Sequence, residues 1–289
     1  MEAAGKRYIS HGSRKDRFRI WNFSDLHMLA EDHAANHLAR DIKQVAEDPF
    51  SFWIGGGDYV DCISRNDPRF SPDSVSKKLT ISDLGRLGEV GFREVRNTFA
   101  PIADKCLGLL IGNHELQYMI RKEQEDRHAW LCMDLGVPNL NYSSFFDVVF
   151  VRNGKRIPTL SRSAPEKEGG NRAQFRVWCH HGAGMATTPG GKMNRLIKAM
   201  ADFRADIYMM GHVHDRMARR QPVLGADAPC ANIVQFDRLG VISGSYLKTY
   251  TDKKGGLPSY GEQRLYSPTS LGAASVKIHP DSRTMTAEV

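Results

Sequence analysis

The fold is decided by the stretch Phe18-Arg19-Ile20-Trp21-Asn22-Phe23-Ser24-Asp25-Leu26-His27. Its first six residues form a largely apolar run, with Arg19 and Asn22 as the exceptions, that predicts a strand, and a polar segment follows directly. Four later stretches of the chain also consist of an apolar run followed directly by polar residues. These later runs are expected to be strands at residues 50–54, 106–111, 174–179 and 206–210. Because sites of open α/β sheets gather beyond the carboxyl ends of the strands, the polar groups after the five runs could converge in space.

The segments between these runs have helical composition at residues 31–48, 82–103, 117–135 and 192–203. Short apolar runs alternating with longer amphipathic ones predict an α/β fold. Asn153-Gly154 predicts a hairpin between strands at 145–152 and 155–160, and Pro280-Asp281 predicts another near the C-terminus. Neither a repeat nor a change in composition marks a linker. We therefore expect a single domain over residues 1–289.

Composition sets broad limits on the class of protein. The chain has 289 residues, 41% hydrophobic and 25% charged, and no run approaches the roughly 18 apolar residues that cross a bilayer. The N-terminus lacks a secretory signal, so we expect a soluble, cytoplasmic protein without a membrane partner. The five cysteines never form a CxxC pair, which favours buried free thiols. A net charge of +7 favours anionic partners, nucleic acid among them.

Side chains of the types that bind divalent metals follow all five apolar runs. They are Asp25 and His27, Asp58 and Asp61, Asn113 and His114, His180 and His181, and His212 and His214. Asp and His bind Mn, Fe and Zn, and the absence of thiolates from the set argues against a structural zinc site. A carboxylate that bridges two ions about 3.5–4 Å apart suits the hydrolysis of phosphate esters.

Each fragment alone is weak evidence, because the chain has 11 histidines and a DxH pair is commonly a surface or core feature. We expect His33 and His37 on a solvated helix face, and His11, His128 and His279 at the surface. Coincidence becomes implausible only when all five fragments occur in order, each after a predicted strand.

Together these fragments resemble the calcineurin-like metallophosphoesterase family. The motifs are Asp25-Leu26-His27, Gly57-Asp58-Tyr59-Val60-Asp61, Gly112-Asn113-His114-Glu115, His180-His181-Gly182 and Gly211-His212-Val213-His214. The resemblance implies a sandwich of two mixed β-sheets flanked by helices, with a dinuclear metal site at one edge. It implies a first metal held by Asp25, His27, Asp58 and His214, and a second held by Asp58, Asn113, His180 and His212. The cofactors would be two divalent ions, Mn²⁺ foremost, with Fe, Zn or Ni as alternatives.

The resemblance also implies roles for the neighbouring residues. His114 would act as general acid or stabilise charge at the leaving oxygen, and Asp61 would orient a histidine. The family's ligand is the first residue after the strand, which favours His180 over His181. His181 would then face substrate or solvent.

Two positions bear on the substrate. Phosphoprotein phosphatases of the family carry arginines where this chain has Cys62 and Ile111, and such arginines grip a monoester dianion. Arg65, Lys192, Arg195 or Lys248 could substitute. With the basic charge, this favours phosphodiesters, including nucleotides or nucleic acid, and so a phosphodiesterase or nuclease. A phosphomonoesterase or phosphoprotein phosphatase is the alternative, and a polyanion-binding module with a non-catalytic metal site is the non-enzymatic one.

Two further segments carry open alternatives. Four tyrosines among basic residues could form a groove for single strands or could pack as strand residues; they are Tyr246, Tyr250, Tyr260 and Tyr266. The glycine-rich segment 182–191 could be a substrate lid or a connector.

Overall fold

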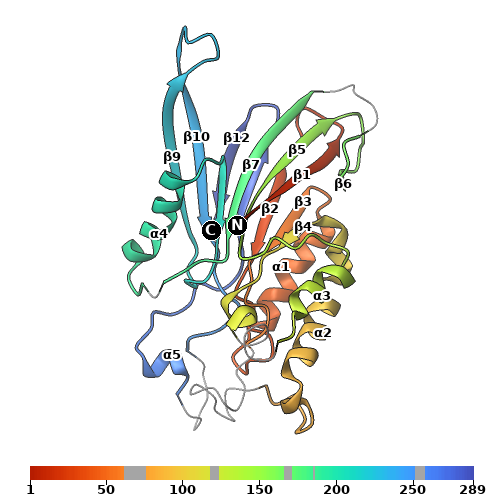
Figure 1. Ribbon diagram of the computed structural model, residues 1–289, viewed down its shortest axis with the longest axis vertical. Helices are drawn as coiled ribbons and strands as arrows, with labels where there is room; N and C mark the ends of the chain where they lie inside the picture. The colour runs from red at the N-terminus through yellow and green to blue at the C-terminus, as the bar shows by residue number, and fades with distance from the viewer. Residues whose placement is uncertain (62–75, 118–123, 166–170, 185, 251–257) are drawn as a thin grey trace.

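Two β-sheets packed face to face form the centre of the molecule in the computed structural model, with helices on their outer surfaces (Figure 1). The structure describes residues 1–61, 76–117, 124–165, 171–184, 186–250 and 258–289. Both sheets contain parallel and antiparallel pairs. This arrangement confirms the predicted α/β sandwich of two mixed sheets.

The larger sheet has seven strands in the order β6-β1-β5-β7-β8-β10-β9. Their bounds are β1 Glu2–His11, β5 Ser143–Arg152, β6 Thr159–Ser161, β7 Arg172–His180, β8 Ile207–Met210, β9 Met217–Ala226 and β10 Ile233–Ile242. The smaller sheet has the order β12-β11-β2-β3-β4. Its strands are β2 Phe18–Phe23, β3 Ser51–Gly55, β4 Cys106–Leu109, β11 Ala274–His279 and β12 Thr284–Glu288.

Helices cover the outer faces of both sheets (Figure 1). The α-helices are α1 Ala35–Glu47, α2 Leu87–Phe99, α3 Arg127–Asp134, α4 Pro189–Asp202 and the short α5 Tyr260–Gln263, and the 3₁₀ turns are η2 Asp83–Gly85 and η3 Ala100–Lys105. Among the residues that the structure describes, no helix is both long and apolar enough to cross a membrane.

Alternation along β2 shows how one strand serves two apolar layers. Phe18 and Ile20 lie in the core between the sheets, whereas Trp21 and Phe23 lie in the core beneath α1 and α2. Because successive side chains of a strand point to opposite faces, a strand covered on both sides needs apolar residues on both faces. That is why four of the six residues from 18 to 23 are apolar, two on each face of the strand.

The chain departs from the predicted elements in several places. The hairpin at Asn153-Gly154 is wrong, because β6 pairs antiparallel with β1 and not with β5. The backbone N–H groups of Asn153 and Gly154 both donate to the carbonyl oxygen of His11 instead. The strand β1 was not predicted, and the expected helix at 82–103 is divided into η2, α2 and η3. Part of the helix expected at 117–135 lies outside the described residues, and α3 accounts for its second half.

Candidate metal centre

Five Asp and His residues at the ends of three strands adopt left-handed backbone conformations. Their φ angles are 54° for Asp25, 48° for His27, 53° for Asp58, 71° for His212 and 51° for His214. Only a few per cent of residues other than glycine adopt positive φ, and each such residue costs on the order of 1–3 kcal/mol. The fold therefore holds the backbone at these three strand ends in a strained form, which is typical of functional sites.

Hydrogen bonds between the segments after β2 and β3 maintain this backbone. Asp25 N donates to Gly57 O at 2.9 Å, and His27 N donates to Asp58 O at 3.1 Å. Gly57 has a φ of 93°, and a Cβ at this position would lie 2.6 Å from Gly112 N. Only glycine fits there. The two segments thus run side by side and bring Asp25, His27 and Asp58 to one point.

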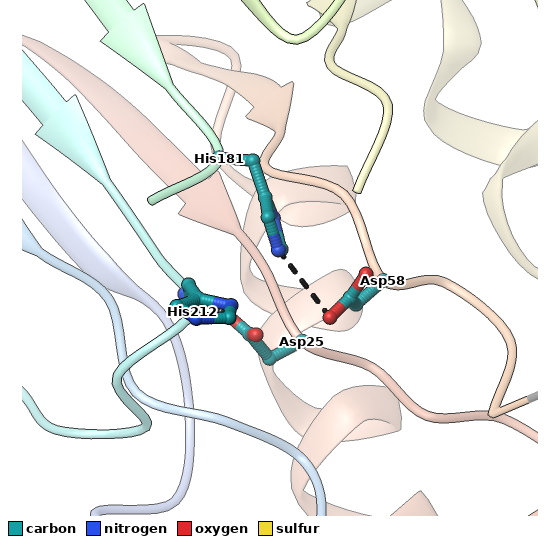
Figure 2. Close-up of side chains that lie close together, drawn as sticks. All are labelled: Asp25, Asp58, His181 and His212. Atoms are coloured by element: carbon teal, nitrogen blue, oxygen red, sulfur yellow. Dashed lines mark hydrogen bonds and ion pairs between the residues drawn. The ribbon is translucent and has the colours of Figure 1, made fainter. Parts of the chain in front are cut away.

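The side chains at the strand ends gather into overlapping groups, and Figure 2 shows the group of Asp25, Asp58, His181 and His212. In each group, one potential ligand atom per residue lies within 4.8 Å of all the others. The groups are Asp25, Asp58, His181 and His212; Asp25, His27 and His214; and His27, Asp58 and His114. Asp25 and Asp58 belong to two groups each, so two buried carboxylates lie at the junctions of the cluster.

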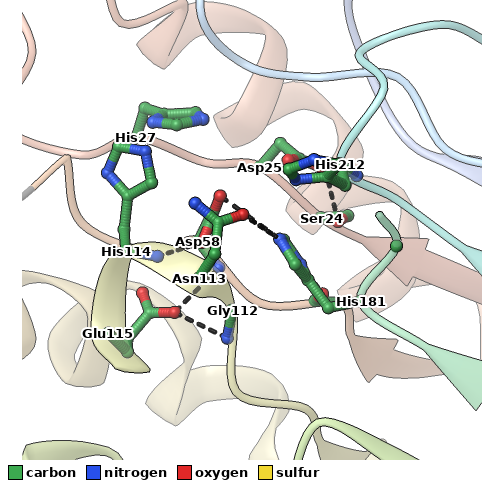
Figure 3. A network of polar contacts seen from close by, with 12 residues as sticks. Ser24, Asp25, His27, Asp58, Gly112, Asn113, His114, Glu115, His181 and His212 are labelled. Atoms are coloured by element: carbon green, nitrogen blue, oxygen red, sulfur yellow. Dashed lines mark hydrogen bonds and ion pairs between the residues drawn. The ribbon is translucent and has the colours of Figure 1, made fainter. Parts of the chain in front are cut away.

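His181 presents a lone pair to two oxygen atoms. Its Nδ1 donates to Gly56 O at 2.8 Å, so a neutral ring carries no proton on Nε2. That Nε2 lies 2.9 Å from Asn113 Oδ1 and 3.3 Å from Asp58 Oδ2 (Figure 3). Burial lowers the pKa of His181, but the charge of Asp58 outweighs it and raises the pKa to about 10. The three converging atoms need a cation between them, either a proton or a metal ion.

His27 and His214 meet in a similar way. His27 Nδ1 donates to the Asp61 carboxylate at 3.0 Å, and its Nε2 lies 3.3 Å from His214 Nε2. Burial lowers the pKa of His27, which keeps its ring neutral. A neutral ring that donates through Nδ1 directs the Nε2 lone pair at His214. Two imidazole nitrogens so placed fit a shared metal ion.

Asp25 supplies the oxygen for this second group. Its Oδ2 accepts from the Ser24 hydroxyl at 2.5 Å and from His212 N at 2.8 Å. Its buried Oδ1 accepts no hydrogen bond among the described residues and lies 3.2 Å from His214 Nε2. Burial raises the pKa of Asp25, but His214 outweighs it and the pKa falls to about 2. A buried carboxylate oxygen without a hydrogen bond fits a divalent cation.

His180 lies outside these groups and His181 lies within one, whereas the sequence favoured His180 as the ligand. Strand β7 extends to His180, one residue further than predicted, so the first residue after the strand is His181. The His180 ring stacks on Trp178 at 5.5 Å, and its Nδ1 accepts from Gly182 N at 2.8 Å. Because side chains alternate along a strand, that one-residue shift exchanges the two histidines.

His114 and Asp61 form the third side of the cluster. His114 Nδ1 donates to Asp61 O at 2.5 Å, and His114 N donates to Asp58 Oδ1 at 2.8 Å. The ring lies 4.8 Å from the His27 ring. Burial lowers the pKa of His114, but the charges of Asp58 and Asp61 outweigh it and raise the pKa. Asp61 thus contacts His27 through its carboxylate and His114 through its carbonyl oxygen.

Glu115 has a structural role that the sequence did not predict, although the residue belongs to the Gly112-Asn113-His114-Glu115 motif. Its fully buried carboxylate accepts from the backbone N–H groups of Asp58 at 3.0 Å, Tyr59 at 2.7 Å and Gly112 at 2.8 Å (Figure 3). Burial and the charge of Asp58 raise the pKa of Glu115 to about 7. The presence of an acidic residue directly after His114 could have indicated this role. Glu115 ties the segment after β3 to the segment after β4.

The expected substrate residues lie around the cluster with partners of their own. Lys192 is buried, and its Nζ lies 3.3 Å from Asp215 Oδ2, next to His214. A Cβ on Gly184 would lie 3.0 Å from the Arg195 guanidinium, and Gly184 O accepts from His212 Nε2 at 3.1 Å. Arg195 therefore lies against the segment that contacts His212.

The remaining candidates lie in the same region or outside the described residues. Ile111 is buried, and Lys248 is exposed. The buried Tyr246 donates to Asp41 Oδ2 at 2.8 Å, which excludes it from a stacking surface. Cys62 and Arg65 fall outside the described residues. His11 and His128 are buried, so their expected surface position is wrong.

A comparison with models of protein families gives a match over most of the chain. The model of the calcineurin-like phosphoesterase family matches residues 18–216, a span that includes every residue of the cluster. A search of curated proteins found no match to this chain.

Two solved structures are similar to the chain at low identity. One is a conserved uncharacterized protein, a predicted phosphoesterase, from Streptococcus pneumoniae TIGR4, with 12% identity, a TM-score of 0.30 and coverage of 91% of this chain and 84% of that chain. The other is a single mutant of Vps29 from Entamoeba histolytica, with 10% identity, a TM-score of 0.32 and coverage of 94% and 97%.

Proposed function

Because the chain belongs to the calcineurin-like phosphoesterase family, we propose that it is a hydrolase that cleaves phosphate esters with metal-activated water. The observation that carries the proposal is the convergence of buried carboxylates and imidazoles within 4.8 Å at the strand ends. The proposed ligands are Asp25, His27, Asp58 and His214 for one ion, and Asp58, Asn113, His181 and His212 for the other. His181 takes the place that the sequence had favoured for His180.

Two divalent ions, with Mn²⁺ foremost and Fe, Zn or Ni as alternatives, would lower the pKa of a water and polarise the phosphate oxygens. The chain's own residues provide the rest. The Nδ1–H group of His114 donates to the carbonyl oxygen of Asp61, and the raised pKa of His114 favours the cationic ring. Its Nε2 can therefore give a proton to the leaving oxygen as general acid. Asp61 positions this ring and that of His27.

Phosphodiesters are the proposed substrates. A monoester dianion calls for a guanidinium clamp, and buried Ile111 stands where related phosphoprotein phosphatases carry an arginine. Lys192 is held by Asp215 and so is not free for that role. A diester has a single negative charge and needs less of a clamp. Nucleotides or nucleic acid fit this preference and the net charge of +7.

A phosphomonoesterase is the second candidate, favoured by the close similarity of Gly57 to Asp61 to the phosphoprotein phosphatase motif. The non-enzymatic alternative is a polyanion-binding module whose metal site does not turn over substrate. Asp25, Asp58 and His114 all belong to the groups whose potential ligand atoms lie within 4.8 Å of one another, which favours an active centre over the module.

One comparison of substrates separates these candidates. The protein is purified with Mn²⁺, and hydrolysis of bis-aryl phosphate, mono-aryl phosphate, cyclic nucleotides, labelled DNA and labelled RNA is measured. We expect the highest kcat/KM for a diester. Equal or faster hydrolysis of the monoester would contradict the diester preference, and no hydrolysis with full metal content would favour the binding module.

A further inference from the structure

A cavity of about 240 Å³ lies away from the metal centre and is lined by three arginines. Arg152 ends β5, Arg172 begins β7, and Arg283 lies in the turn between β11 and β12. Three separate segments thus bring guanidinium groups to one hollow. Asp281 is the acidic residue in its lining.

The direction of β7 shows that this cavity and the metal cluster lie at opposite ends of the larger sheet. β7 starts at Arg172 and ends at His180, directly before His181 of the metal cluster. Nine residues of extended strand span on the order of 26 Å. A small molecule bound at the metal centre therefore cannot reach the cavity, and the cavity is a separate site.

The guanidinium groups are fixed but retain free donors. Arg283 Nη2 donates to Gln174 O at 3.1 Å, and its guanidinium lies 4.9 Å from the centre of the Phe175 ring. Arg152 is paired with Asp281. Arg172 is exposed, and its side chain has no hydrogen bond or ion pair within the part of the chain that the structure describes. Five N–H donors on each arginine leave several directed at solvent or the hollow.

Exposed basic residues continue from the cavity onto the neighbouring connections. The segment between β1 and β2 carries Arg14, Lys15 and Arg17, and the segment between β5 and β6 carries Lys155 and Arg156. These two segments are in contact, because a Cβ on Gly12 would lie 2.8 Å from Lys155 O. The first segment also contacts the C-terminal hairpin, where His279 Nε2 donates to Arg14 O at 2.8 Å.

Acidic residues do little to neutralise this surface. The four segments, residues 12–17, 152–158, 171–172 and 280–283, contain eight Lys and Arg but only Asp16 and Asp281 as acids. Asp16 accepts from Ser13 N at 2.8 Å and contacts His11 Nδ1 at 3.0 Å, and Asp281 is paired with Arg152. We call these four segments the basic end.

We propose that the basic end binds the phosphate backbone of double-stranded nucleic acid, with the arginine-lined cavity receiving a phosphate. The four segments contain no aromatic residue, and the aromatic rings in the cavity lining, His11 and Phe150, are buried, so none of these residues offers an exposed ring on which an unpaired base could stack. Contacts to phosphate alone favour the duplex, which carries one negative charge per roughly 1.7 Å of axis. A membrane surface fits less well, because Ile157 is the one large apolar side chain exposed there and a cavity does not match a flat bilayer.

Binding is tested with a fluorescent 30-base-pair duplex in EDTA, so that hydrolysis cannot interfere. The wild-type Kd should rise with salt, because bound counterions are released. Arg172→Glu should weaken binding at least tenfold, and Arg172→Ala and Arg283→Ala should each reduce the salt slope by about 1. Arg96→Glu is the matched control, since Arg96 is exposed on α2, and it should leave the Kd unchanged.

Several outcomes would overturn the proposal. An unchanged Kd and salt slope for Arg172→Glu would exclude this surface, as would tighter binding of phosphatidylserine vesicles or of the single strand than of the duplex. Binding here is independent of the proposed hydrolysis. All these variants should keep the wild-type kcat/KM for bis-aryl phosphate. Hydrolysis therefore tests the proposed metal centre and duplex binding tests the basic end, so either proposal can fail without the other.

Discussion

At the scale of single residues, the centre is organised by where each imidazole keeps its proton. His27 and His114 both donate through Nδ1 to Asp61, one to the carboxylate and the other to the carbonyl oxygen. His181 donates through Nδ1 to Gly56 O. Because the Nδ1 atoms of all three rings are engaged in this way, their Nε2 atoms are the ring nitrogens that can contact a metal ion or the substrate. A second partner that fixes the ring is typical of metal-binding histidines.

The variant His114→Ala isolates the proposed general acid. Removing a positioned proton donor costs about 10²–10⁴-fold in the chemical step. We expect kcat to fall by that factor while the metal content, measured by elemental analysis, stays at the wild-type value, because His114 is outside both proposed ligand sets. A substrate with a good leaving group needs less protonation and should lose less rate. Turnover equal to wild type would remove this role from His114.

A pair of adjacent variants tests the exchanged histidines. His181→Ala should lower metal content and activity together, because His181 Nε2 faces Asp58 and Asn113. His180→Ala should leave the metal content near wild type, since that ring contacts Trp178 and Gly182 instead. Metal titration by calorimetry measures both. The reverse order of effects would restore the assignment made from the sequence.

At the scale of elements, β2 and β3, which are buried on both faces, were predicted to within one residue, whereas β1, whose first half is exposed, was missed. The bounds of β2 agree with the prediction because four of its six residues are apolar and they lie on both of its faces. The strand β1 was missed because its first half is largely exposed and its buried side includes Arg7, whose Nε donates to Leu107 O at 2.9 Å. A buried arginine with a distant partner breaks the apolar pattern.

The error at Asn153-Gly154 has a similar cause. This dipeptide allows a tight turn, and Gly154 does adopt a φ of 86°. The partner of the following strand was nevertheless decided by long-range contacts, because β5 is already paired with β1 and β7 on its two sides. Local turn preference cannot show which edge of a sheet is free. The candidate ligands that gather in the cluster were easier to find in the sequence, because each lies within a few residues of the end of a strand.

Helix α3 carries a buried histidine that should make stability depend on pH. The His128 ring stacks 6.0 Å from Tyr59, and burial lowers its pKa from 6.5 to about 4. Above pH 6.5 neither the folded nor the unfolded state binds this proton. As pH falls from 6.5 to 4, the unfolded state takes up the proton and the folded state does not. Stability is therefore lost across that window, by at most about 3 kcal/mol.

Chemical denaturation in EDTA at pH 7, 5.5 and 4.5 measures this contribution. The variant His128→Leu cannot titrate, so its free energy of unfolding should fall less than that of wild type over the same range. The comparison uses the difference between pH values, since the substitution also changes packing. Parallel pH profiles for the two proteins would show that His128 is not the group responsible.

At the scale of the whole molecule, the proposed metal cluster contains residues from both sheets. Asp25 and Asp58 come from the smaller sheet, whereas His181, His212 and His214 come from the larger one. Two buried carboxylates at the junction of the two sheets repel each other without a compensating cation. Bound metal should therefore stabilise the packing of one sheet on the other.

Removal of metal should accordingly lower the melting temperature of the whole protein. A ligand at about 100 times its Kd that binds only the folded state adds about 2.7 kcal/mol. Each kcal/mol corresponds to about 2–4 °C in domains of comparable size, so EDTA should lower the Tm of the Mn²⁺-loaded protein by roughly 5–10 °C. Asp58→Asn is the control, because it removes the proposed bridging carboxylate and should lose metal. Its Tm should be the same with Mn²⁺ and with EDTA. If wild type also melted at one temperature in both, the cluster would not hold a metal that bridges the two sheets.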